Sequence, residues 1–478
     1  MNINPQKGRI KMQRITDKII EAHQDDLIAS TAELIQIPSV KGAPAPNAPF
    51  GTEIRRALDY TLALCRRLGL TAYDADGYAG YAEIPGAQGE QIGVLTHLDV
   101  VPAGDGWSFP PFGAELSQGR MYGRGACDDK GPLISSIYAL AAVKEAGLPL
   151  KKNIRLIFGC DEESGWECMD YYDKKIGLPE IGFSPDADYP VINTEKGILH
   201  AQMHARFTPG AYTLSIEGGT RPNVVCSKAQ AHLEGNIDRL VKLLVAYDCR
   251  SNGISYKATA RTLDVCSEGV SAHASTPQNG RNAFFSLLDF LDTLALGGET
   301  GALVSELRRC FCGKTDGSGF GLALHDEISG ALTLNLGVLR VGSYYTGNPA
   351  DAGVLHGVVD IRYPVCVSDQ TVMEGLCTAS PVLKFKPDHV QPPHHTPEDH
   401  YLVQTLLHVY EEYMKRPARC LAIGGGTYAR ALKTGVAFGV TREGAPELAH
   451  NADEYLVPAD QLQDTKLFAA AFCELLQK

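Results

Sequence analysis

Gln91-Ile92-Gly93-Val94-Leu95-Thr96-His97-Leu98-Asp99 is the stretch of sequence that decides the fold. Its first half is a short apolar run, and this run then breaks into polar residues. Such a change is typical of a buried parallel strand that reaches its carboxyl end. We therefore expect His97 and Asp99 at the end of a strand, where open α/β sheets place their functional crevice.

The same pattern recurs on either side of this stretch. Residues 132–145 read as a helix with proline in its first turn, and residues 154–158 read as a strand that ends in Asp161-Glu162-Glu163. Further helices are expected over residues 15–38, 54–68, 401–414 and 461–476, with a strand over 436–440. Strands that alternate with helices predict an α/β fold, with a mixed, mostly parallel sheet flanked by helices.

The composition and the pattern of the sequence change between about residues 200 and 390. Glycine, serine and threonine become more frequent there, and residues 331–339 and 354–361 are strand-like. This region reads as a separate α+β unit. We therefore expect a catalytic domain formed by residues 1–198 and 393–478, interrupted by an inserted α+β lid domain over residues 199–392.

Composition excludes several classes of protein. The 478 residues exceed what one core supports, and 44% apolar with 21% charged residues is ordinary for a globular protein. A formal net charge of -12 argues against nucleic-acid and anionic-membrane partners, and no apolar run is long enough to span a membrane. Thirteen scattered cysteines favour reduced thiols and a cytoplasmic location, with a zinc site at Cys310 and Cys312 as a weak alternative.

Acids and an imidazole collect at the expected strand ends. They are His97 and Asp99, Asp128 and Asp129 in a turn before a helix, Glu162 and Glu163, and Asp186 and Asp188. Each set alone has a structural explanation, as a helix cap, a turn or a solvated loop. Taken together, histidine and carboxylate donors without cysteine suit a hydrolytic zinc, cobalt or manganese site and not a structural zinc site.

The ordered motifs of the chain resemble the PepV-type dipeptidases. These belong to the metallopeptidase family that also holds aminoacylase, carboxypeptidase G and succinyl-diaminopimelate desuccinylase. The similar segments cover nearly the whole chain and are residues 96–102, 106–107, 110–112, 123–132, 161–168, 271–274, 360–364, 424–428 and 449–450. The residues after Asp186, and Asn451 to Glu454 after His450, match the family's pattern only approximately.

The resemblance implies a two-metal site. It assigns His97 and Asp186 to one ion, Glu163 and His450 to the other, and Asp128 to both as a bridge. Asp99 would orient His97, and Glu162 would be the general base. The family often has a cis peptide bond after the bridging aspartate, here between Asp128 and Asp129.

The resemblance also assigns roles to the lid and to a turn beyond it. His273 would stabilise the oxyanion, and Arg362 would bind the carboxylate of the substrate. Asn223 would also reach the substrate, and the turn with Gly424 and Gly425 would present backbone N–H groups to the same carboxylate.

The expected activity is hydrolysis of the peptide bond of dipeptides by two divalent ions, with zinc favoured over manganese or cobalt. The substrate would be the sole partner class, and a lid long enough to supply His273 within one chain predicts a monomer. An N-acyl-amino-acid deacylase is the alternative within the same chemistry. A non-catalytic peptide-binding relative is the alternative from another class.

Overall fold

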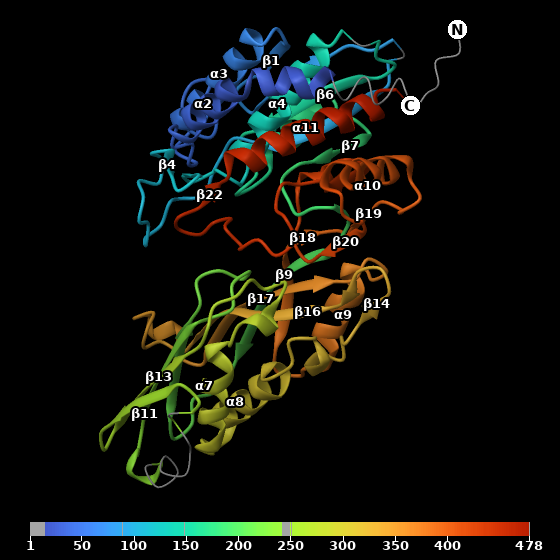
Figure 1. Ribbon diagram of the computed structural model, residues 1–478. Helices are drawn as coiled ribbons and strands as arrows, with labels where there is room; N and C mark the ends of the chain where they lie inside the picture. Colours follow the sequence, from blue (N-terminus) through green and yellow to red (C-terminus); the bar gives the residue numbers. More distant parts are fainter. Residues whose placement is uncertain (1–14, 88, 148, 241–248, 250, 478) are drawn as a thin grey trace. The chain divides into compact units, whose positions relative to one another are not determined.

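The computed structural model describes residues 15–87, 89–147, 149–240, 249 and 251–477. The chain forms two compact units (Figure 1). Unit 1 comprises Met1–Asn193, His395–Leu421 and Gly426–Lys478, and unit 2 comprises Thr194–His394 and Ala422–Gly425.

A nine-stranded mixed sheet organises unit 1. Its four central strands run parallel, because β3 pairs with β6 and β7 in parallel and β21 joins β7 in the same sense. β1, β2 and β8, which lie further from the centre, pair antiparallel with their neighbours. The order along the sheet is β1 (Thr71–Ala75), β2 (Ala79–Ile84), β6 (Asn153–Gly159), β3 (Gln91–His97), β7 (Ile181–Ser184), β21 (Thr434–Ala437), β8 (Val191–Glu195) and β19 (His394–His395), with β20 (Cys420–Ile423) paired to β8.

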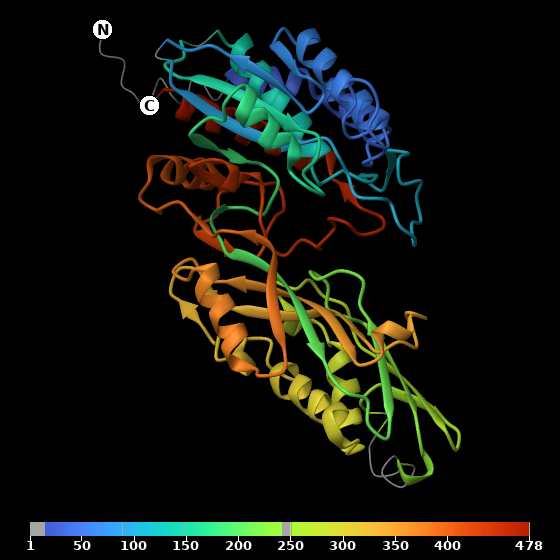
Figure 2. The same cartoon turned by 180° about the vertical axis from the view of Figure 1, so that it is seen from behind.

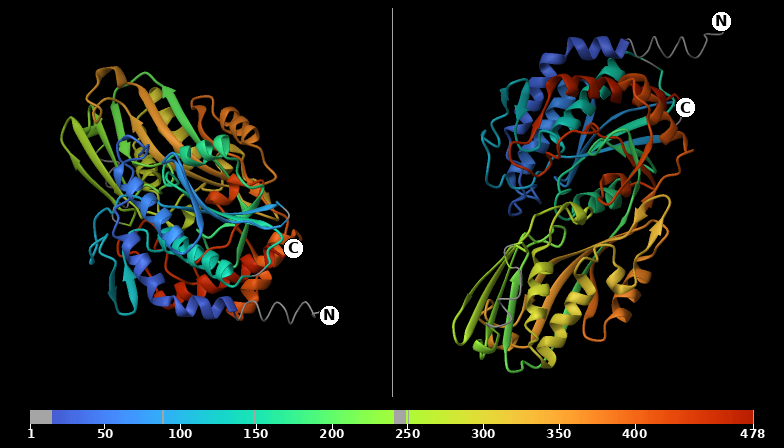
Figure 3. Two further views of the ribbon diagram at one scale, coloured as in Figure 1. Left: turned by 90° about the horizontal axis from the view of Figure 1, so that it is seen from above. Right: turned by 60° about the horizontal axis from the view of Figure 1, so that its bottom comes forward.

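Helices cover both faces of this sheet. Gly80 of β2 faces Leu58 of α3 (Thr52–Arg67), whereas Tyr81 meets the ring of Tyr172 in α5 (Glu167–Lys175) at 5.9 Å, and neighbouring strand residues point to opposite faces. α4 (Lys130–Glu145) is buried along almost its whole length, as its apolar sequence requires. It packs against α2 (Gln24–Ile35) and α11 (Pro458–Leu475) on one side of the sheet (Figure 3), and α10 (Tyr401–Met414) adjoins α11.

A small three-stranded sheet ties the end of the chain to its first half. Its strands are β4 (Glu115–Ser117), β5 (Arg120–Tyr122) and β22 (Tyr455–Leu456). Tyr455 pairs with Tyr122 and Leu456 with Met121. The loop before β22 is therefore held next to the turn that follows β5.

Unit 2 is an antiparallel sheet with helices on one face (Figure 2). In β9, Leu199, Ala201, Met203 and Ala205 are buried and alternate with more exposed residues, as expected for a sheet covered on one side. The covering helices are α7 (Ala283–Thr293), α8 (Gly298–Phe311) and α9 (Asp369–Ala379). The strand order is β12 (Ile254–Ala258), β13 (Thr262–Glu268), β11 (Lys228–Glu234), β10 (Thr213–Gly218), β16 (Thr333–Val341), β17 (Val354–Tyr363), β9 (Gly197–Arg206) and β18 (Lys384–Gln391).

The predicted fold class is confirmed, with local differences. The helix expected over residues 15–38 is interrupted at His23 and ends at Ile35, and β3 extends to His97 instead of ending before it. None of the thirteen cysteines, all of which lie among the described residues and include Cys310 and Cys312, forms a disulfide bond. Among the described residues, no helix is both long and apolar enough to cross a membrane.

Candidate metal centre

Three neighbouring parallel strands of unit 1 bring the acidic and imidazole side chains together. His97 is the last residue of β3, Glu163 follows β6, and Asp186 follows β7. Parallel strands end at one edge of a sheet, so these residues converge there. Asp128 joins them from the turn before α4, and His450 from the loop before β22.

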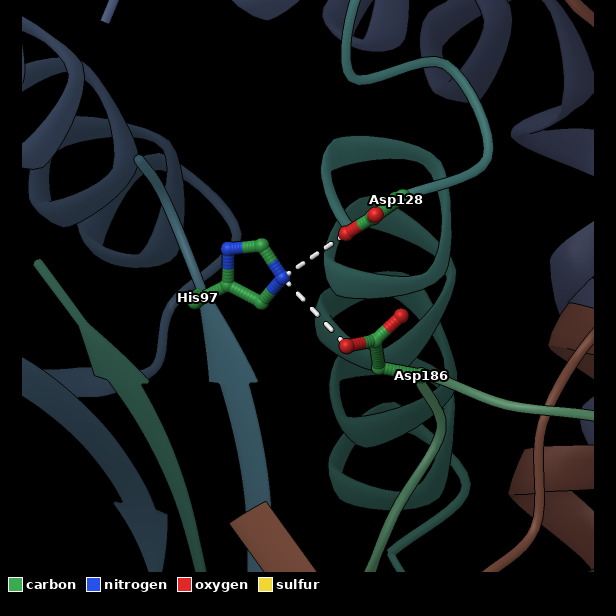
Figure 4. Close-up of side chains that lie close together, drawn as sticks. All are labelled: His97, Asp128 and Asp186. Atoms are coloured by element: carbon green, nitrogen blue, oxygen red, sulfur yellow. Dashed lines mark hydrogen bonds and ion pairs between the residues drawn. The ribbon is translucent and has the colours of Figure 1, made fainter. Parts of the chain in front are cut away.

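His97, Asp128 and Asp186 form the first group of possible ligands (Figure 4). Nε2 of His97 lies 3.0 Å from Oδ1 of Asp128 and 3.3 Å from Oδ2 of Asp186. Nδ1 of the same ring donates to the backbone carbonyl of Asp99 at 2.9 Å. This hydrogen bond fixes the ring so that Nε2 faces the two acids.

Asp128, Glu163 and His450 form the second group. Nε2 of His450 lies 3.2 Å from Oδ2 of Asp128 and 3.0 Å from Oε2 of Glu163. The two carboxylate oxygens of Asp128 thus face different imidazoles. This is the geometry that a carboxylate shared by two cations needs.

Burial and mutual repulsion disturb the protonation of these groups. Burial and the charge of Asp128 raise the pKa of Glu163 to about 7 and also raise the pKa of Asp186. Burial raises the pKa of Glu162 well above its usual range. Hydrogen bonds to Asp128 and Glu163 raise the pKa of His450 to about 11.

The donor set fits a pair of divalent cations. In each group the candidate ligand atoms all lie within 4.8 Å of one another, and all are imidazole nitrogens or carboxylate oxygens. Such donors suit zinc, manganese or cobalt. Crowded acids in a buried site need positive charge beyond two imidazoles, and two divalent ions would supply it.

Asp99 holds the loop that carries the two glutamates. Its carboxylate accepts from the backbone N–H groups of Glu162 and Glu163, each at 3.0 Å, and lies 3.6 Å from Nδ1 of His97. Asp99 therefore contacts His97 mainly through its carbonyl and the glutamates through its side chain. The peptide bond between Asp128 and Asp129 is cis, which confirms that prediction.

In unit 2 the predicted residues lie in two places: Asn223 is next to His273, and Arg362 is next to the turn with Gly424 and Gly425. His273 bridges to Val224, and the N–H of Ala274 donates to the carbonyl of Asn223 at 3.0 Å. His273 is exposed, and its Nδ1 lies 2.7 Å from Oγ of Ser275. A side chain added at Gly424 would contact this same Ser275.

Arg362, in the second of these places, is 4% exposed. Its Nε and Nη2 donate to the two carboxylate oxygens of buried Asp360, at 2.6 and 2.7 Å, and its Nη1 donates to the carbonyl of Gly424 at 2.8 Å. The guanidinium group is thus held in one orientation beside the turn that contains Gly424 and Gly425.

Three residues of these sites escaped the sequence analysis. Asp360 lies two positions before Arg362 on one strand, so the two-residue period places both side chains on one face and is a usable signal. Arg124 and Glu454 form a buried pair, with Nη1 of Arg124 2.6 Å from Oε2 of Glu454. Nothing in their spacing of 330 residues reveals that contact.

Known proteins resemble the chain over nearly its full length. The model of peptidase family M20/M25/M40 matches residues 93–474. "Putative dipeptidase YtjP" of Bacillus subtilis is 40% identical, with 95% of this chain and 97% of the relative covered. "Beta-Ala-Xaa dipeptidase" of Lactobacillus delbrueckii subsp. lactis is 33% identical, with 96% and 97% covered.

Solved structures share the fold at lower identity. Human carnosine dipeptidase 1 superposes with a TM-score of 0.59 at 16% identity, covering 98% of this chain and 99% of that one. Dug1p, a dipeptidase of Saccharomyces cerevisiae, has a TM-score of 0.58 at 14% identity, covering 98% and 99%. The extent of the family match and the identity to full-length relatives confirm the predicted relationship, and the chain belongs to peptidase family M20/M25/M40.

Proposed function

We propose that the chain hydrolyses the peptide bond of dipeptides at a site that binds two divalent cations. The observation that carries the proposal is the position of Asp128, whose two oxygens face the imidazoles of His97 and His450 separately. The dipeptidase names of the relatives that are 40% and 33% identical support the substrate class. We propose zinc as the ion, with manganese or cobalt as alternatives.

Two divalent cations, when bound by His97, Asp128, Glu163, Asp186 and His450, supply Lewis acidity and lower the pKa of water. Glu162 is the general base in this proposal. Asp99 fixes its backbone, and burial keeps its pKa well above the usual range, which suits a group that must accept a proton and then release it. Glu162 takes the proton of the attacking water and delivers it to the leaving amine.

Unit 2 provides the groups that select and polarise the substrate. Arg362, already fixed by Asp360, binds the terminal carboxylate, and the backbone N–H groups of Gly424 and Gly425 bind the same group. His273 stabilises the oxyanion, and Asn223 assists from the adjacent segment. A carboxylate held one residue beyond the scissile bond leaves room for only one residue there, which favours dipeptides.

A substrate panel tests this function. Protein stripped with a chelator and reloaded with zinc, manganese or cobalt is assayed on dipeptides, on tripeptides and on N-acetyl amino acids. We expect cleavage of dipeptides with a free amino group, loss of activity after stripping, and recovery with at least one of the ions. Undiminished activity after stripping contradicts the metal site, and a preference for N-acetyl amino acids identifies a deacylase instead.

We also propose a cytoplasmic monomer. Unit 2 contains His273 and Arg362 in the same chain as the metal ligands, so a second chain is not needed to supply them. The thirteen free thiols suit a reducing compartment. Sedimentation analysis that finds an obligate dimer contradicts the monomer.

A further inference from the structure

Two loops that carry metal ligands meet around one buried carboxylate. Residues 123–128 end in Asp128, and residues 450–454 begin with His450. Glu454 is the last residue of the second loop and is 0% exposed, and its carboxylate reaches the first loop. Its Oε2 accepts from the N–H of Gly125 at 3.1 Å, and its Oε1 accepts from the N–H groups of Cys127 at 2.9 Å and Asp128 at 3.3 Å. The carboxylate therefore shapes the loop up to the backbone of Asp128 itself.

Arg124, in the first loop, hydrogen-bonds to the side chain of Glu454 and to the backbone of His450. It is 1% exposed, and its Nη1 donates to Oε2 of Glu454 at 2.6 Å. Its Nη2 donates to the carbonyl of His450 at 3.2 Å and to the carbonyl of Ala103 at 3.1 Å. One guanidinium group thus joins the carboxylate that shapes one ligand loop to the backbone of the ligand in the other loop.

The backbone of this region is in unfavourable conformations that need such support. His450 has a φ of +64° and Asp453 a φ of +57°, in the left-handed region that side chains other than glycine rarely adopt. A residue stays in this region only when its surroundings enforce it. For His450, the hydrogen bond from Arg124 to its carbonyl is one such constraint.

We propose that Arg124 and Glu454 form a positioning pair that sets the distance between Asp128 and His450, and so tunes the affinity of one of the two cation sites. This inference rests on the proposed function for the presence of the cations. The pair is one cation and one anion, so its net charge is zero, and it acts through geometry more than through the field at the site. Neither residue is a ligand or touches the substrate in this proposal.

The effect is expected to be unequal between the two ions. The group of Asp128, Glu163 and His450 depends on the pair through two of its three members. The group of His97, Asp128 and Asp186 depends on it through Asp128 alone. Loss of the pair should therefore weaken the first of these sites much more than the second.

The test compares variants of the full chain by their cation affinity. Glu454→Gln keeps the size of the side chain but turns an N–H donor toward backbone donors. Glu454→Asp retracts the carboxylate by about 1.5 Å. Arg124→Lys keeps the charge but cannot reach Glu454 and His450 together. If Glu454→Gln fails to fold, the same measurements are made on Glu454→Asp and Arg124→Lys, which conserve the charges of the pair.

Glu83→Gln is the matched control. It also removes a carboxylate that binds an arginine of unit 1, since Arg155 donates to Glu83 at 2.8 and 3.0 Å. Glu83 pairs in register with Arg155, near the start of β6, whereas Glu163 follows the end of that strand. This control therefore tests for general effects of losing an ion pair.

Zinc is titrated into stripped protein against a competing chelator, and melting of the metal-free protein is recorded. We expect Glu454→Gln to weaken one site by ~10–100-fold, the usual effect of losing a group that orients a ligand, and to change the other by less than about threefold. Saturating zinc should restore most of kcat. Glu83→Gln should bind both ions as the wild type does.

Three results would overturn the inference. They are unchanged affinity at both sites, equal weakening of both sites, and loss of kcat that saturating zinc does not restore. If the wild-type chain itself binds no cations or cleaves no dipeptide, the proposed function fails as well. If the wild-type chain binds cations and cleaves dipeptides, and Glu454→Gln has the same cation affinities as the wild type, only the positioning pair is rejected.

Discussion

At the scale of single residues, the two imidazoles proposed as ligands, His97 and His450, must lose a proton from the binding nitrogen before a cation can take its place. Asp128 and Glu163 raise the pKa of His450 to about 11 in the metal-free protein. For His97, burial opposes protonation, but hydrogen bonds to Asp128, Asp186 and Asp99 raise the pKa well above 6.5. At both rings the shift of the pKa favours the protonated form, in which a proton competes with a cation for the ring nitrogen.

We predict that cation affinity rises with pH between 6 and 9. Each displaced proton contributes up to about tenfold per pH unit below the raised pKa, because proton and cation compete for the same nitrogen. Titration calorimetry in buffers of different ionisation enthalpy counts the protons released at pH 7. A dissociation constant independent of pH would show that the rings are already neutral.

His273 is expected to act on turnover and not on cation binding. His273→Ala should keep both cations and lower kcat by ~10²–10³, the usual effect of losing an oxyanion donor. Steady-state kinetics and a metal assay on the same sample measure this. Near-normal turnover would remove the role assigned to His273.

Arg362 is expected to act on substrate binding. Arg362→Ala should raise KM for dipeptides strongly, because the terminal carboxylate loses a fixed partner that can bind it through two hydrogen bonds. Asp360→Asn should give a smaller rise in KM with kcat nearly unchanged, since Asp360 orients the guanidinium group through two bonds. Unchanged kinetics of both variants would place the carboxylate elsewhere.

At the scale of elements, the two strands that lead to the candidate ligands His97 and Asp186 are neighbours, and the space between them at Gly182 has no room for an added Cβ. Gly182 of β7 pairs with Gly93 of β3, and a Cβ built on Gly182 would lie 2.0 Å from the carbonyl oxygen of Gly93. The three heavy atoms nearest to the added Cβ are all backbone atoms of Gly93, which cannot move aside as a flexible side chain could. β3 ends at His97, and β7 leads to Asp186.

We predict that Gly182→Ala separates these strands. The free energy of unfolding of unit 1 should fall by ~1–3 kcal/mol, as for other overpacked cores, and cation binding at His97 and Asp186 should weaken. Denaturation followed by tryptophan fluorescence reports unit 1, because both tryptophans, Trp107 and Trp166, lie there. Gly42 also lies in unit 1 and is exposed, and an added Cβ would meet only the Cα atom of Gly51 at 3.8 Å within 4 Å, so Gly42→Ala is the matched control and should change little.

The elements also show what the sequence could and could not predict. α10 covers the expected residues 401–414, and β3, β6 and α4 lie within two residues of prediction, because apolar runs that end in polar turns are local signals. The pair of Arg124 and Glu454 joins positions far apart in the chain, which local signals do not reach. The donor chemistry of the sequence indicated a hydrolytic metal site but left several acids open, and the assignment of single residues, His450 among them, came from the family resemblance. The dual role of Asp99 required coordinates.

At the scale of the whole molecule, the chain leaves unit 1 and returns to it at adjacent points. The side-chain amide of Asn193 donates to the carbonyl of Thr396 at 2.8 Å, and the N–H of Thr396 donates to the carbonyl of Asn193 at 2.8 Å. Unit 2 is thus inserted between two neighbouring residues of unit 1, and a short linker can join them.

We predict that replacing Thr194–His394 with a short glycine and serine linker separates binding from catalysis. The shortened protein should bind two cations, since all five candidate ligands remain, but it should not cleave dipeptides, since His273 and Arg362 are gone. Elemental analysis and a dipeptide assay measure the two properties. Residual hydrolysis would show that unit 1 suffices for the chemistry.

The position of His450 after unit 2 along the chain also orders events during synthesis. A nascent polypeptide leaves the ribosome from its amino end, and domains fold as their residues emerge. Unit 2 is nearly complete once His394 has emerged, while unit 1 still lacks α11 and one imidazole of the second cation group. In the proposed two-cation site, the second group of ligands is therefore complete only after the whole of unit 2 has been synthesised, so unit 2 can fold on the ribosome before that cation site exists.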